Sequence, residues 1–137
     1  MNAKSLYPYL FLLLALILSA CSTPAPTPTA TPVDPTIIAQ GFWDAINAKN
    51  IDAAMAFLAE DVQIRGGKTN FSSKADFSAF MLSVSETITY EISNMKVVSE
   101  DTVSYTGKVY ENSTMVASGY NRKVQIKDGK IALIELP

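Results

Sequence analysis

The chain has 137 residues with 11 basic and 13 acidic side chains, no histidine and a single cysteine. A near-neutral balance without a basic run argues against nucleic-acid binding. The missing histidine excludes Ser-His-Asp and Cys-His relays and most zinc sites, and one cysteine excludes an intramolecular disulfide, so we expect no metal and no cofactor.

The first twenty residues have the pattern of a secretory signal peptide. Lys4 supplies a positive start, and residues 10–20 (LFLLLALILSA) form an uncharged apolar run of eleven residues. A spanning helix needs roughly 20 such residues, so the run is too short for a permanent anchor and fits a signal h-region instead. We therefore expect residues 1–20 to be a cleaved targeting segment.

The cysteine stands directly behind this run. Leu18-Ser19-Ala20-Cys21 resembles the lipobox of bacterial lipoproteins. The resemblance implies cleavage before Cys21 and acylation of its sulfur with fatty chains such as palmitate, which hold a protein firmly on a membrane when two or more are present. The expected location is extracytoplasmic and lipid-anchored, at the outer membrane if the cell has two membranes.

A proline-rich tract follows the cysteine. Residues 22–36 contain five of the chain's seven prolines. Such a tract favours extended polyproline II, so we expect residues 21–35 to form the lipidated cysteine and a semi-rigid stalk. A ligand for SH3-type domains is the alternative interpretation.

A helical pattern begins at Asp34-Pro35, an N-cap followed by proline at the first helical position, and runs to Lys49. A second helix is predicted from Asn50 or Asp52, with Leu58 on its apolar face. Glu60-Asp61 is predicted to end that helix, and a short strand is predicted at residues 62–64.

The rest of the chain reads as one more helix and then strands. Ser73 and Asp76 have the spacing of a capping box, with Phe77, Phe80, Met81 and Val84 facing inward. Alternation then predicts strands near 88–92, 103–109, 116–126 and 131–134, and Asp128-Gly129 predicts a hairpin turn. Even-numbered residues 116–126, Tyr120 and Arg122 included, are predicted to share one face. Three helices and an antiparallel sheet give the α+β class.

Two segments of the chain resemble a known superfamily. IIAQGFWDAINAKNIDAAMAFLAEDVQI and the closing DGKIALIEL are similar to the first and last parts of nuclear transport factor 2-like domains, which include ketosteroid isomerases and SnoaL-like polyketide cyclases. The resemblance covers residues 36–137. It implies three N-terminal helices on a curved, mostly antiparallel sheet, a cone with an interior pocket, and a homodimer.

The positions that carry catalysis in this superfamily are vacant here. The first-helix tyrosine of the isomerases corresponds to Phe42, their base to about Gly66, and their strand aspartate to Asn121 or Arg122. The His-Asp pair of SnoaL-like and dehydratase relatives has no counterpart, because the chain has no histidine. We therefore predict no catalytic residue.

Other side chains remain candidates for lining a pocket, Phe42 among them. Asp61 with Arg65 is one acid-base candidate, whose plainer interpretation is a helix-ending turn with a surface ion pair. Arg122 with Tyr105 or Tyr120 is a candidate for binding a carboxylate. Tyrosines on strands also suit a core or a dimer interface.

The leading hypothesis is a lipid-anchored domain that binds a small apolar or carboxylate ligand, or a partner protein, without catalysis. The alternatives are an isomerase-, cyclase- or dehydratase-like enzyme with a non-standard pocket, and a structural dimerisation module of the cell envelope.

Overall fold

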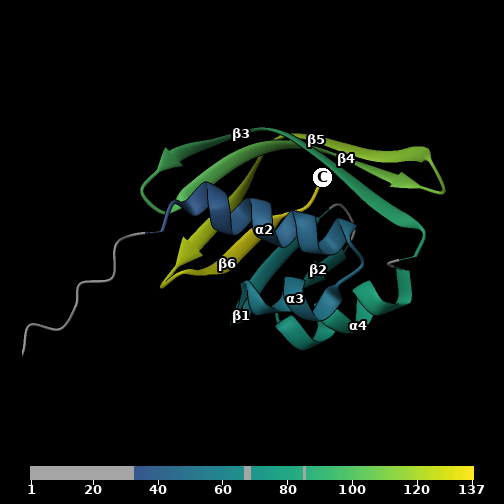
Figure 1. Cartoon of the computed structure of the whole chain (residues 1–137), viewed down its shortest axis with the longest axis horizontal. Coiled ribbons are helices and arrows are strands. Elements are labelled where there is room, and N and C mark those ends of the chain that lie inside the picture. Colours follow the sequence, from purple (N-terminus) through teal and green to yellow (C-terminus); the bar gives the residue numbers. More distant parts are fainter. Residues whose placement is uncertain (1–32, 67–68, 85) are drawn as a thin grey trace, which may run out of the picture. The chain divides into compact units, whose positions relative to one another are not determined.

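The computed structural model describes residues 33–66, 69–84 and 86–137, so Cys21, the signal segment and nearly all of the predicted stalk lie outside the described residues. Within these ranges no helix has the length and apolar character that crossing a membrane requires. The α+β class is confirmed (Figure 1). The elements in chain order are α2 (Pro35–Asn47), α3 (Ile51–Ala56), β1 (Leu58–Gly66), β2 (Thr69–Phe71), α4 (Lys74–Val84), β3 (Ile88–Ser99), β4 (Thr102–Glu111), β5 (Thr114–Lys127) and β6 (Lys130–Glu135).

The helix starts follow the local sequence. Asp34 accepts a hydrogen bond from the Thr36 N–H (2.9 Å), and Asn50 caps α3 through the Ala53 N–H (3.1 Å). At α4 the Ser73 hydroxyl accepts from the Asp76 N–H (3.2 Å) and donates to the Asp76 carboxylate (2.7 Å). Each bond satisfies backbone or capping groups that a helix end leaves unpaired. These predicted caps are confirmed.

The six strands form one mixed sheet in the order β2-β1-β6-β5-β4-β3. All neighbouring pairs are antiparallel except β1 with β6, which is parallel. The prediction that Glu60-Asp61 ends a helix is wrong, because both residues lie inside β1. Leu58 pairs with Ile131 and the Ile131 N–H donates to the Phe57 carbonyl (2.8 Å), so distant β6 determines where β1 begins.

Two bulges bend the sheet at the same point. The β3–β4 register shifts between Ser93 and Lys96, and the β4–β5 register shifts opposite Tyr105 and Gly107. Asn94 and Asn121 have φ of 53° in these shifted segments, a left-handed conformation that asparagine tolerates. Extra residues on both neighbours of β4 increase twist and curvature there.

The bulge in β5 also corrects a prediction about its faces. Even-numbered residues of 116–126 do not share one face, since Tyr120 is 77% exposed whereas Val124 is fully buried. A bulge inserts a residue into the alternation and so exchanges inward and outward positions along the strand.

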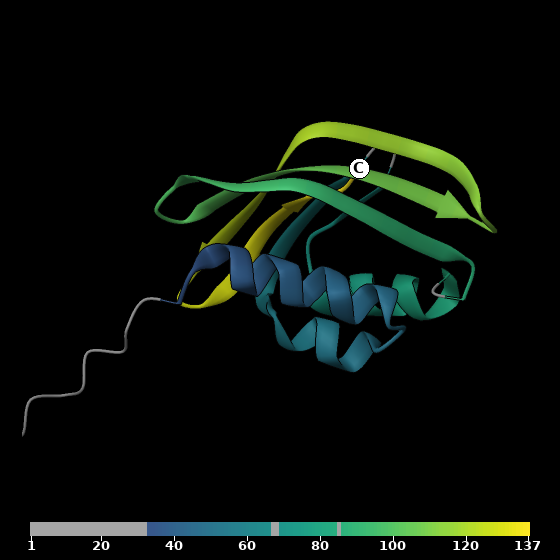
Figure 2. The same ribbon diagram turned by 45° about the horizontal axis from the view of Figure 1, so that its top comes forward.

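The core lies between the sheet and the helices. Figures 1 and 2 show β3, β4 and β5 arching over α2, with α3 on the side of α2 away from that arch. Phe42 and Trp43 of α2 are buried against the sheet, and the Trp43 ring centre lies 5.0 Å from that of Tyr90 and 5.5 Å from that of Tyr105. Aromatic contacts at these separations add to the stability gained by burial.

Strand β3 lies at one edge of the sheet, and side chains after α2 cover part of that edge. The Asn47 amide donates to the Tyr90 carbonyl (2.7 Å) and accepts from the Tyr90 N–H (2.9 Å). The Lys49 ammonium donates to the Ile88 carbonyl. Asn47 thus occupies the place of a further strand at Tyr90, and it holds Tyr90 in position from the helical side.

Candidate functional site

A cavity of about 150 Å³, here called the inner cavity, lies where β2 and α4 meet the helix-facing side of the sheet. Its walls are mainly apolar, and the hydroxyls of Thr69 and Tyr90 are their polar side-chain groups. Among the described lining residues no side chain carries a carboxylate, ammonium or guanidinium group. The lining residues are Gly66, Thr69, Phe71, Phe80, Tyr90, Val109, Leu136 and Pro137.

The aromatic wall of the inner cavity comes from β2 and α4. Phe71 packs on Phe80 at 5.1 Å between ring centres and on Phe77 at 5.4 Å. Phe77 is 1% exposed and in turn contacts Phe42, whose ring centre is 6.4 Å away. The wall is therefore backed by the core, which makes its position rigid.

Tyr90 supplies the best-placed polar group. Its side chain is 7% exposed, and burial raises the pKa of its hydroxyl to about 12. Among the described residues its hydroxyl forms no hydrogen bond, whereas its backbone is held by Asn47. The hydroxyl oxygen is not among the enclosed polar atoms that lack a partner, so Tyr90 is a neutral donor open to an acceptor that enters the cavity.

Leu136 and Pro137 close the cavity on the side of the sheet. The Leu136 N–H donates to the Arg65 carbonyl (2.6 Å), and the Tyr105 hydroxyl donates to the Glu135 carbonyl. A Cβ atom at Gly66 would lie 2.6 Å from the Leu136 Cβ, and one at Gly107 would overlap the Pro137 ring. These two glycines leave the room that Leu136 and Pro137 fill.

The residues predicted to line a pocket do not come together. Phe42 is fully buried in the core, behind the aromatic wall. Asp61 and Arg65 are both exposed on β1, and neither takes part in the ion pairs found in the described part of the chain, Lys74–Glu60 and Lys108–Glu91. Asp61 lies in a surface pocket of about 500 Å³ beside Lys127, Asp128 and Lys130.

The second predicted group comes together only in part. Tyr105 and Arg122 are paired across β4 and β5, and Tyr105 is 1% exposed. Burial raises the pKa of the Tyr105 hydroxyl, and the nearby Arg122 guanidinium partly offsets the rise. The Arg122 side chain lies over Gly119 with a buried Nε that has no acceptor among the described residues. Tyr120 is exposed and does not join them.

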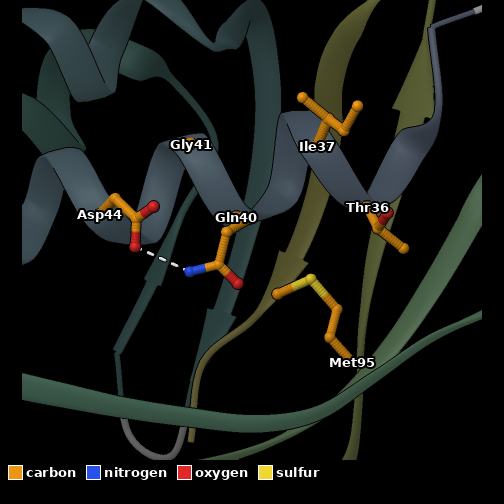
Figure 3. Close-up of a pocket in the computed structure, with 6 residues that line it drawn as sticks. All are labelled: Thr36, Ile37, Gln40, Gly41, Asp44 and Met95. Carbon is orange, nitrogen blue, oxygen red and sulfur yellow. Dashed lines mark hydrogen bonds between the residues drawn. The ribbon is translucent and has the colours of Figure 1, made fainter.

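A larger groove of about 520 Å³ runs between α2 and the edge strand β3 (Figure 3). Gln40 and Asp44 face it and bond to each other (2.7 Å), and Met95 of β3 lies opposite them. Ile37 is 63% exposed in this groove. Its polar groups satisfy one another in water, so the groove has neither the desolvation nor the free donor that the inner cavity has.

Sequence reasoning missed most of the inner cavity. Phe71 was missed because β2 was not predicted, and Leu136 and Pro137 because their positions depend on Gly66 and Gly107. Tyr90 is one of the strand tyrosines, for which the sequence favoured a place in the core or in a dimer interface. Within residues 33–66, 69–84 and 86–137 no group of three His, Cys, Asp or Glu side chains is placed to hold a metal ion.

Comparison with known proteins gives a family and a fold. Residues 39–134 match the family model of the SnoaL-like domain. No curated protein matches the sequence. Structures with the same fold include an NTF2-like protein of unknown function from Cytophaga hutchinsonii, with a TM-score of 0.66 and 18% identity over 77% of this chain and 90% of that one.

Two further structures show the range of proteins built on this fold. One is a computationally designed 17-OHP binder, with a TM-score of 0.66 and 18% identity over 77% of this chain and 90% of that one. The other is a putative polyketide cyclase from Xanthomonas campestris pv. campestris, with a TM-score of 0.59 and 20% identity over 75% of this chain and 90% of that one. At these identities the likeness concerns the fold alone.

Proposed function

Because the chain belongs to the SnoaL-like domain family, which has the NTF2-like fold, we propose that it binds a small, mainly apolar ligand in the inner cavity without transforming it. The observation that carries the proposal is the chemistry of the cavity walls. They offer apolar side chains and two neutral hydroxyl donors, of which that of Tyr90 belongs to a buried residue and that of Thr69 to an exposed one. The preferred ligand therefore has a single ring and one oxygen that accepts a hydrogen bond.

Catalysis of the isomerase, cyclase or dehydratase kind needs an acid or base that titrates near the working pH. Tyr90 is the one titratable side chain among the described lining residues, and a pKa of about 12 keeps it protonated. A hydroxyl of this kind can hold a carbonyl oxygen, but none of these side chains is a base that could remove a proton from the ligand. The same fold can serve enzymes and binding proteins. The proposal therefore rests on the side chains of the cavity walls and not on the fold.

The test compares cyclohexanone with methylcyclohexane, two single-ring probes of which only the first has an acceptor. We expect both to shift ligand-detected NMR signals in the presence of the protein. Tyr90→Phe removes one hydrogen bond worth about 0.5–1.5 kcal/mol, which weakens cyclohexanone binding about 2- to 12-fold and leaves methylcyclohexane unchanged. Tyr110→Phe is the matched control, since the Tyr110 hydroxyl bonds Glu91 away from the cavity (2.9 Å).

A second variant fills the space itself. Val109→Phe places a ring in the cavity and should abolish binding of both probes while the protein stays folded by circular dichroism. The proposal is wrong if neither probe binds the wild type, or if Val109→Phe binds them unchanged.

We also propose that the domain is anchored to the outside of a membrane through acyl chains on Cys21. The lipobox-like sequence, the apolar run before it and the proline-rich tract after it support this proposal. Metabolic labelling with radioactive palmitate should mark the wild type and not Cys21→Ser, which should remain an uncleaved or mislocalised precursor. Equal labelling of the two would refute it.

A homodimer is the third proposal, with the sheet as its interface. Strands β3 and β5 expose large apolar side chains, among them Val98 (50%), Met115 (55%) and Tyr120 (77%). Three of these side chains, Met115, Val116 and Tyr120, lie on β5, and exposed apolar groups that gather on one element are typical of interfaces. Sedimentation equilibrium should give a dimer that Tyr120→Lys dissociates, whereas Leu82→Lys on exposed α4 has no effect. A monomeric wild type at high micromolar concentration contradicts this proposal.

A further inference from the structure

The inner cavity is small for a ligand site. Ligand pockets usually measure about 300–1,000 Å³, whereas this one measures about 150 Å³. A cavity of roughly that size in another protein holds benzene. The volume is thus matched to one ring, and the question is which residues impose the limit.

Helices and strands supply most of the cavity lining, and a stretch of two residues, Leu136 and Pro137, supplies the rest. Leu136 continues the pairing of β6 with β1, since its N–H donates to the Arg65 carbonyl, and the chain then runs under the arch of β3–β5 (Figures 1 and 2). The Leu136 side chain lies beside Gly66 of β1, and Pro137 reaches Gly107 of β4.

The stretch is held by few bonds. The Leu136 N–H pairs with the Arg65 carbonyl, and the Tyr105 hydroxyl pairs with the Glu135 carbonyl. Pro137 has no N–H and therefore donates no backbone hydrogen bond of its own. Beyond those two bonds, the positions of Leu136 and Pro137 depend on their side chains packing over Gly66 and Gly107.

We propose that Leu136 and Pro137 determine ligand specificity by size, as a plug that limits the inner cavity to single-ring ligands. The inference rests on the proposed binding function and adds the residues that restrict it. Trimming the plug joins its volume to the cavity, which then admits a fused two-ring ligand of the same chemistry. The hydrogen bond from Tyr90 serves both ligand sizes, because Tyr90 lies on β3 and its backbone is bound by Asn47.

The test uses two ketones, cyclohexanone with one ring and 2-decalone with two fused rings. The variants are Leu136→Ala/Pro137→Ala and the milder Pro137→Ala, which spares the Leu136 anchor. The matched control is Leu133→Ala, a partly buried residue of β6 outside the cavity lining. Dissociation constants are measured by ligand-detected NMR on the folded protein, with folding checked by circular dichroism.

We expect the wild type and Leu133→Ala to bind cyclohexanone at least tenfold more tightly than 2-decalone. The double variant should bind 2-decalone at least tenfold more tightly than the wild type does, and Pro137→Ala should show a smaller gain in the same direction. If the double variant does not fold, Pro137→Ala alone tests the proposal. The plug is then refuted if Pro137→Ala binds 2-decalone no more tightly than the wild type does.

The two proposals fail in different ways. If the wild type binds cyclohexanone but no variant gains affinity for 2-decalone, or if the wild type binds both ketones equally, the plug is refuted and the binding function stands. If the wild type and all variants bind neither ketone, the binding function is refuted and the plug with it.

Discussion

Asn47 joins the end of α2 to the edge of the sheet, so its removal tests how Tyr90 is positioned. In Asn47→Ala the amide that donates to the Tyr90 carbonyl (2.7 Å) and accepts from the Tyr90 N–H (2.9 Å) is lost. Each hydrogen bond is worth about 0.5–1.5 kcal/mol, so the free energy of unfolding should fall by about 1–3 kcal/mol.

Urea unfolding followed by circular dichroism measures this loss, and amide hydrogen exchange locates it. In the variant the Tyr90 N–H has no partner and should exchange faster. Gln40→Ala on the same helix is the control, because Gln40 bonds only Asp44 on the surface and should change stability by less than about 0.5 kcal/mol. A loss below about 0.5 kcal/mol for Asn47→Ala, with unchanged exchange at Tyr90, would refute the reasoning.

Two further predictions concern the core and the pH dependence. Phe77→Ala removes a ring that is 1% exposed and should cost about 3–5 kcal/mol in urea unfolding, whereas Leu82→Ala on the same helix, 66% exposed, should change little. Hydrogen bonds from Lys108 and Tyr110 lower the pKa of Glu91 from its ordinary value of 4.5. A lowered folded-state pKa means that this stabilisation is present above pH 4.5 and is lost as the pH falls through the folded-state value, so Glu91→Gln should be less stable than the wild type at pH 7 and should match it at pH 2. A difference that grows toward low pH would have the wrong sign.

The sequence predicted those features that depend on neighbouring residues, namely the helix caps and the hairpin turn. Asp34, Asn50 and Ser73 cap their helices as expected, and the Lys127–Lys130 pair closes the hairpin at Asp128-Gly129. Each feature depends on residues only a few positions apart. The helices and the later strands could therefore be predicted without knowledge of the rest of the fold.

Features that depend on distant partners could not be predicted. The start of β1 at Leu58 depends on Ile131, and the outward position of Tyr120 depends on a bulge opposite β4. The residues of the inner cavity were not identified for the same reason. The predicted Asp61 and Arg65 are exposed on β1, whereas the cavity walls include β2, α4 and residues 136–137. The comparison with catalytic positions of the superfamily drew attention to Phe42 and Gly66. It did not predict that Leu136 fills the space beside Gly66.

The central place of β6 has a consequence for folding order. This strand is the last in the chain, yet it lies between β1 and β5 and makes the one parallel pairing in the sheet. The contacts Leu58 to Ile131 and Arg65 to Glu135 each span about 70 residues of sequence, and such long-range pairings slow folding. The meander β3–β4–β5 can form early from neighbouring strands, but β1 and β2 have nothing to join until residues 130–136 have left the ribosome. The sheet is therefore completed only when residues 130–136 are available, after the meander can already have formed.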